Sequence, residues 1–120
     1  MFKNSDIISV YTRAQAIEDG FLADLTALFP EEAKLYRFPV ACTTSIWSMI
    51  ETAVDKKQGD LKGIVWDILY MSQKGITRKI SESTMLFEVF IGRKSHIFKV
   101  NVGAGDQGEG TVTIMQENED

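Results

Sequence analysis

Met85–Val102, which reads MLFEVFIGRKSHIFKVNV, is the stretch that decides the fold of this chain. Apolar and other residues alternate along Met85–Ile91 and again along His96–Val102. This two-residue period is typical of strands that bury one face, and the glycine and polar residues of Gly92–Ser95 form a turn-like break between the two runs. The pattern therefore predicts a β-hairpin.

A third strand is expected directly after this hairpin. The glycine-rich segment Gly103–Gly110 leads into Thr111–Met115, whose β-branched residues favour a strand. The last residues, Gln116–Asp120, are an acidic tail. The C-terminal third therefore predicts an antiparallel meander of three strands.

The first two-thirds of the chain are expected to be mainly helical. Helices are expected over four segments, each with a residue suited to its start or stop: Tyr11–Gly20, Pro30–Leu35, the stretch from Thr43–Ser45 to Val54, and Leu61–Gly75. In the last of these, Asp60 is the expected N-cap, and Trp66 and Tyr70 lie four residues apart, close enough to touch. Phe21–Leu25 alternates weakly and is either a short strand or an extended link.

Together these elements predict an α+β fold. The helical N-terminal two-thirds would pack on one face of the three-stranded C-terminal meander, with one short N-terminal strand left open as an addition. No repeat or composition shift divides the chain, so residues 1–120 are expected to form a single domain.

Composition narrows the function classes. The formal net charge of −4 argues against non-specific nucleic-acid binding, which depends on Lys and Arg neutralising phosphates. Neither a signal-peptide pattern nor an apolar run of about 20 residues occurs, so no membrane association is expected. A single cysteine, Cys42, cannot form an internal disulfide. These features predict a cytoplasmic protein.

Catalytic signals are few. His96 alternates in register with apolar residues, which favours a partly buried strand histidine, and Cys42 is more simply a small buried residue than a nucleophile. The Gly103–Gly110 loop lacks the lysine of a phosphate-binding loop, and its Asp106 and Glu109 would repel an anion. We expect no metal site and no cofactor.

Seven polar or aromatic residues stand out as candidate binding residues: Tyr11, Arg13, Glu18, Asp19, Trp66, Asp67 and Asp106. Arg13 and Glu18 are five residues apart, which is a poor spacing for an ion pair on one helix. Arg13 is therefore expected to make its contacts elsewhere in the fold. Each of these seven residues can have either a structural role or a functional one.

Three blocks of the sequence resemble a family of small proteins of unknown function that plasmids, phages and other mobile elements encode. The blocks are Tyr11–Gly20 (YTRAQAIEDG), Val65–Met71 (VWDILYM) and Gly103–Met115, and Phe38–Ala41 lies between them in the expected order. The resemblance covers most of the chain. It implies a mobile-element protein but assigns no catalytic residue.

Two functions from different classes follow. The first is an accessory protein that binds a protein partner, for example to interfere with a host defence system. The alternative is a small enzyme or ligand binder with a cleft between Arg13 and the Trp66–Asp67 helix, where a carboxylate would supply acid–base chemistry. Direct DNA binding ranks lowest, because few basic residues cluster. A homodimer through unpaired sheet edges stays open.

Overall fold

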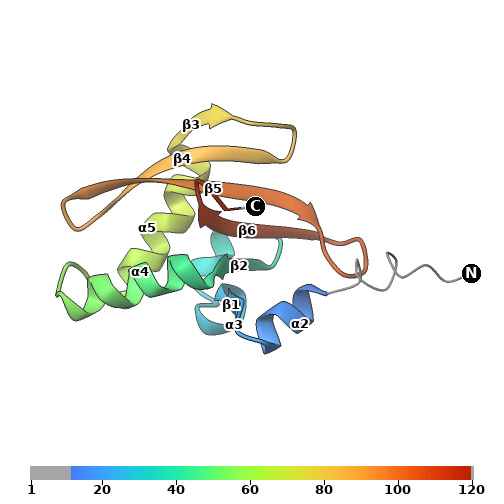
Figure 1. Ribbon diagram of the computed structural model, residues 1–120, viewed down its shortest axis with the longest axis horizontal. Helices are drawn as coiled ribbons and strands as arrows, with labels where there is room; N and C mark the ends of the chain where they lie inside the picture. The colour runs from blue at the N-terminus through green and yellow to red at the C-terminus, as the bar shows by residue number, and fades with distance from the viewer. Residues whose placement is uncertain (1–11, 120) are drawn as a thin grey trace, which may run out of the picture.

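The computed structural model describes residues 12–119 (Figure 1). Its helices are α2 (Arg13–Glu18), α3 (Leu25–Leu28), α4 (Thr44–Asp55) and α5 (Leu61–Lys74), with a 3-10 helix, η1 (Glu32–Leu35). Its strands are β1 (Leu22–Asp24), β2 (Val40–Thr43), β3 (Ile76–Lys79), β4 (Thr84–Ile91), β5 (Lys94–Ala104) and β6 (Gly110–Gln116).

All the strands join one mixed sheet of six, in the order β1-β2-β6-β5-β4-β3. The β2–β6 pair is parallel and the other pairs are antiparallel. Figure 1 shows β3 at one edge of the sheet and β1 toward the other. The α+β class fits, but the expected three-stranded meander is wrong. Two N-terminal strands and β3 extend it on both sides.

Strand β2 was missed because it is short and buried on both faces. Its residues Val40, Ala41 and Cys42 are at most 1 % exposed, since β2 lies between β1 and β6. A strand buried on both faces shows no alternation of apolar and polar residues. Pro39, just before it, accepts a hydrogen bond through its carbonyl from the Val112 amide at 2.8 Å, which begins the parallel pairing.

Strand β3 was missed for the opposite reason. All four of its residues are exposed, because it is an edge strand that covers no part of the core. It follows α5 after Gly75 and pairs with β4, with a register shift between Ile76 and Arg78. A strand without a buried face has no hydrophobic period for a sequence pattern to detect.

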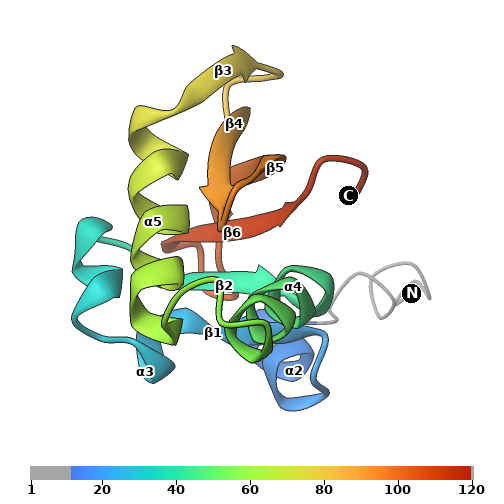
Figure 2. The same cartoon turned by 90° about the vertical axis from the view of Figure 1, so that its left-hand side faces the viewer.

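The hairpin and the two long helices form as predicted and enclose the core. Phe87 on β4 lies opposite Phe98 on β5, and their rings meet edge to face with centroids 6.0 Å apart. α5 buries the residues of its predicted stripe, Ile64, Val65, Ile68, Leu69 and Ser72. In Figure 2, α5 stands on one side of the sheet, and α4 lies beside β2. Both helices contribute side chains to the same cluster as the hairpin.

Local signals at the helix ends also hold. The Thr12 hydroxyl accepts from the Gln15 amide, and the Gln15 side chain accepts from the Thr12 amide, so a capping box starts α2. Gly20, with φ of +83°, takes the left-handed conformation just after α2. Asp60 caps α5 by accepting from the Gly63 amide. Between residues 12 and 119, no helix has the length and apolar character needed to cross a bilayer.

Candidate functional site

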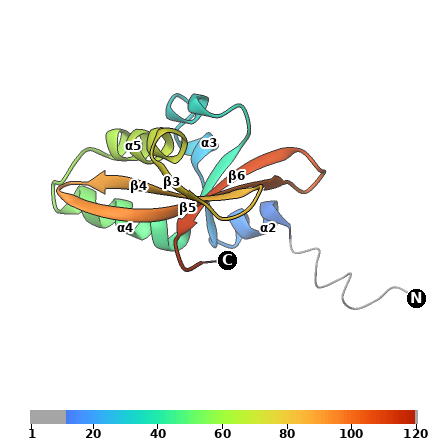
Figure 3. The ribbon, with the colours of Figure 1, turned by 90° about the horizontal axis from the view of Figure 1, so that it is seen from above.

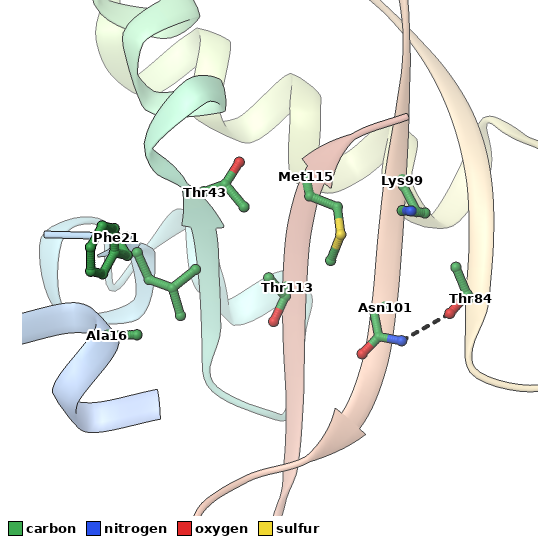
Figure 4. A pocket seen from close by; sticks show the side chains of 9 residues that line it. Ala16, Phe21, Thr43, Thr84, Lys99, Asn101, Thr113 and Met115 are labelled. Carbon is green, nitrogen blue, oxygen red and sulfur yellow. Dashed lines mark hydrogen bonds between the residues drawn. The ribbon is translucent and has the colours of Figure 1, made fainter. Parts of the chain in front are cut away.

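A hollow of about 480 Å³ lies on the face of the sheet turned away from α5. Figure 4 shows side chains from β2, β4, β5 and β6 pointing into it, with Phe21 and Ala16 on one side. Its lining residues are Ala16, Phe21, Leu22, Thr43, Thr84, Lys99, Asn101, Thr113 and Met115.

Strand register explains why polar side chains meet on this face, which we call the open face. Phe98 and Val100 of β5 point into the core, so Lys99 and Asn101, which alternate with them, point away from it. Asn101 lies opposite Thr84 on β4 and Thr113 on β6. Its amide donates to the Thr84 hydroxyl at 2.9 Å. The three side chains therefore form a polar row across the sheet.

Large apolar side chains are exposed on the same face. Phe21 is 63 % exposed at the side of the hollow. Phe90 on β4 is 58 % exposed, and Ile97 on β5 is 36 % exposed. Both alternate with buried residues along their strands, so both lie on the open face. An antiparallel sheet that faces only water is expected to carry polar residues there. Exposed apolar side chains on a face that also carries a hollow are typical of an interaction surface.

Glu119, near the end of the chain, binds next to the hollow. Its carboxylate accepts from the Ser45 hydroxyl at 2.6 Å, the Gln116 amide at 2.7 Å and the Thr43 hydroxyl at 2.9 Å. The Lys99 ammonium donates to the Glu119 backbone carbonyl. Burial raises the pKa of Glu119, but these hydrogen bonds and the charge of Lys99 outweigh it, so the pKa is lowered overall.

Arg13 makes its contacts with β6, as the poor spacing to Glu18 led us to expect. Its guanidinium donates to the Thr113 hydroxyl and to the Val112 carbonyl, both at 2.7 Å. Burial lowers the pKa of Arg13, while the carboxylates of Asp24, Asp106 and Glu109 favour its charged form. An arginine stays charged in proteins, so these are charge-assisted bonds that fix α2 on the sheet.

Asp106, in the glycine-rich loop, lies at the start of α2. Its carboxylate accepts from the backbone amides of Arg13 at 2.7 Å and Ala14 at 3.1 Å. These amides have no partner within a helix, so Asp106 acts as a second cap beside Thr12. The structure thus brings two of the seven candidates, Arg13 and Asp106, together beside a hollow of about 160 Å³.

Removing this cap has a predictable cost. Replacing Asp106 with alanine is expected to lower the free energy of unfolding by about 1 kcal/mol, because two first-turn amides lose their acceptor. Gln107→Ala is the matched control, since the Gln107 side chain makes no hydrogen bond with the described residues. Urea denaturation of both variants checks this. Equal values for the two would show that Asp106 does not stabilise α2.

Trp66 and Asp67 lie elsewhere. Both are on α5, which Figure 3 shows on the opposite side of the sheet from α2. The Trp66 ring, 42 % exposed, stacks on Tyr70 with centroids 4.7 Å apart, which confirms the predicted contact. Burial and the charge of Asp60 raise the pKa of Asp67. Neither residue belongs to the lining of the hollow beside Arg13.

Glu18 and Asp19 are not part of the lining of the hollow beside Arg13. Glu18 is exposed at the end of α2, and Asp19 is the residue that ends this helix. Tyr11 lies outside the described residues. The structure therefore does not assemble the cleft between Arg13, Trp66 and Asp67 that the enzyme hypothesis needs.

Cys42 and His96, the candidates for a nucleophile or a base, lie on different strands, β2 and β5. Cys42 is fully buried in β2, where burial, with a further contribution from Glu119, raises the pKa of its thiol to about 12. Burial and Lys94 lower the pKa of His96. No group of three or more His, Cys, Asp or Glu among residues 12–119 is placed to hold a metal ion.

Sequence reasoning missed the residues that line the hollow, chiefly Thr43, Thr84, Lys99, Asn101 and Thr113. One signal was present: the hairpin alternation assigns Lys99 and Asn101 to the face opposite Phe98. Nothing local identified Thr113, which lies beside Asn101 through the pairing of β5 with β6, or Thr43, which reaches this face through the pairing of β2 with β6.

Fold and site define a small α+β protein with a mixed sheet, which α5 covers on one face and which carries a hollow beside α2 on the other, open face. The chain belongs to the family of unknown function DUF6573, whose model matches residues 1–120. Searches of curated proteins and of solved structures found no match.

Proposed function

We propose that this protein is an accessory protein that binds another protein through the open face of its sheet. The observation that carries the proposal is a hollow of about 480 Å³ lined by exposed Phe21, on the same face of the sheet as exposed Phe90 and Ile97. Aromatic residues at the centre of a partly desolvated patch supply much of the binding energy of protein interfaces.

The proposal also fits the hydrogen bonds of Arg13 and Asp106, the two candidate residues that lie together. Arg13 uses two guanidinium donors, and Asp106 its carboxylate, to hold α2 and the glycine-rich loop on the sheet. These contacts give both residues a structural role. We further propose a cytoplasmic location and a mobile-element origin, with interference in a host defence system as one form of partner binding.

Partner capture from a lysate of the natural host tests the proposal, with two arginine variants as the comparison. Asn101→Arg places a long cation in the middle of the hollow, whereas Trp66→Arg places the same group on exposed α5. Each variant is first compared with the wild type by circular dichroism. The amount of partner that is captured at physiological salt is expected to fall by more than about tenfold with Asn101→Arg. With Trp66→Arg it is expected to stay at the wild-type level.

If capture is instead lost with Trp66→Arg and kept with Asn101→Arg, the partner binds at the exposed Trp66–Tyr70 pair, and the open face is rejected as the binding surface. If no protein is retained above background by folded wild type, binding of a protein partner is itself contradicted. A homodimer through the same face would appear as self-association that Asn101→Arg removes, measured by light scattering.

A further inference from the structure

The open face carries a second feature, a row of side chains that includes two cations. Strand register places Arg78, Leu86, Lys99 and Met115 side by side across β3, β4, β5 and β6. Arg78 and Lys99 are separated by one strand, which corresponds to roughly 10 Å. Arg78 is exposed, and Lys99 lines the hollow. This row therefore places two basic side chains on the open face of a protein whose formal net charge is −4.

The chain's own C-terminal residues show which chemistry this surface accepts. The Glu119 carboxylate is held by the hydroxyls of Thr43 and Ser45, while Lys99 binds the backbone carbonyl of the same residue. Side-chain and backbone oxygens of one acidic residue are thus recognised together. Thr43 and Lys99 also line the hollow, so the acidic residue lies at its border.

The attachment of this segment depends on one residue. Glu119 makes all the side-chain hydrogen bonds that attach residues 117–119, and it also makes the contact with Lys99. A segment that is held by few contacts opens locally at a low cost in free energy. None of residues 117–119 belongs to the hydrophobic core cluster, so their release leaves that cluster in place.

We propose that the hollow and the Arg78–Met115 row bind an acidic, extended segment of the protein partner, and that the C-terminal residues 117–119 compete for the same place. This inference rests on the proposed function and names the chemistry of its partner. An extended segment rises about 3.3 Å per residue, so carboxylates three residues apart span the roughly 10 Å between Arg78 and Lys99.

The test uses a free, fluorescently labelled peptide with the sequence of residues 115–120, MQENED, and the protein of residues 1–120. Its matched control is MQQNQN, in which every side-chain carboxylate is replaced by an amide. Anisotropy is expected to show the acidic peptide binding about five-fold or more tightly to Glu119→Gln than to wild type, because the variant weakens the intramolecular competitor. The control peptide is expected to bind neither protein. The double variant Glu119→Gln/Lys99→Gln is expected to lose this increase in affinity for the acidic peptide.

Equal affinity of wild type and Glu119→Gln, or equal affinity for the two peptides, would overturn the proposal. So would self-association that the wild type shows and Glu119→Gln lacks, since the occupant would then be the C-terminal segment of a second copy. Circular dichroism verifies that the variants fold.

A second measurement needs no variant. Titrating the acidic peptide into isotope-labelled wild type is expected to shift the amide NMR signals of Ser45, Lys99 and Glu119 together. Shifts confined to α5, or none at millimolar peptide, would overturn the proposal. Neither experiment uses the partner itself. A partner that is captured through the hollow but not displaced by the peptide would reject this inference and leave the proposed function standing.

Discussion

Replacing Phe87 with alanine is expected to lower the free energy of unfolding by about 3–5 kcal/mol. Phe87 is fully buried in the middle of β4 and meets Phe98 edge to face across the hairpin. The substitution removes a large apolar surface from the core and leaves a cavity that close-packed neighbours cannot fill. Because small domains have only about 5–15 kcal/mol of stability, this change alone removes a large part of it.

Phe90→Ala is the matched control, because the same residue type is removed from the same strand. Phe90 is 58 % exposed on the open face, so its loss is expected to change stability by no more than about 0.5 kcal/mol. Denaturation in urea, with linear extrapolation, measures both. If the two variants lost equal stability, the register that places Phe87 inside and Phe90 outside would be wrong, since a one-residue slip exchanges the faces.

Replacing Arg13 with methionine is expected to lower the free energy of unfolding by about 2 kcal/mol, because two charge-assisted hydrogen bonds to β6 are lost. The Val112 carbonyl and the Thr113 hydroxyl then lose a partner in a partly buried place. Methionine keeps the length and the apolar stem of the side chain, so the effect reports on the guanidinium. Arg13→Lys is expected to recover little, since an ammonium cannot reproduce the two-donor geometry.

Lys34→Met is the control for Arg13→Met. The Lys34 ammonium lies 3.2 Å from the Glu31 carboxylate, but both side chains are largely exposed. Such exposed pairs contribute about 0–1 kcal/mol, so little change is expected. Thermal and urea unfolding of both variants make the comparison. An Arg13→Met protein as stable as the wild type would show that Arg13 is not needed for the fold, and would return it to the candidate functional residues.

The sequence was sufficient wherever a local physical rule acts alone. The hairpin followed from the alternation around Phe87 and Phe98, α5 from its apolar stripe and the Asp60 cap, and the start of α2 from Thr12. In each case residues a few positions apart determine which side of a strand or helix is buried, or which backbone amide finds a hydrogen-bond acceptor. The match over residues 1–120 shows a family of unknown function, which is the coarser part of what the resemblance implied, and the mobile-element origin stays a proposal.

The candidate site was only partly accessible from the sequence. Arg13 was singled out and was expected to make its contacts away from its own helix, but its partners on β6 are about a hundred residues away in sequence. Glu119 appeared only as part of an acidic tail. Its role depends on Ser45 and Lys99, which lie on α4 and β5.

What the sequence by itself determined is therefore the α+β class, the hairpin, the long helices and the family. Only the tertiary structure decided the sheet of six strands, the parallel pairing of β2 with β6, and the hollow on the open face. The physical reason is that β2 is buried on both faces and β3 on neither, so neither has a period of its own. The hollow forms where strands distant in sequence meet, and no local pattern encodes that meeting.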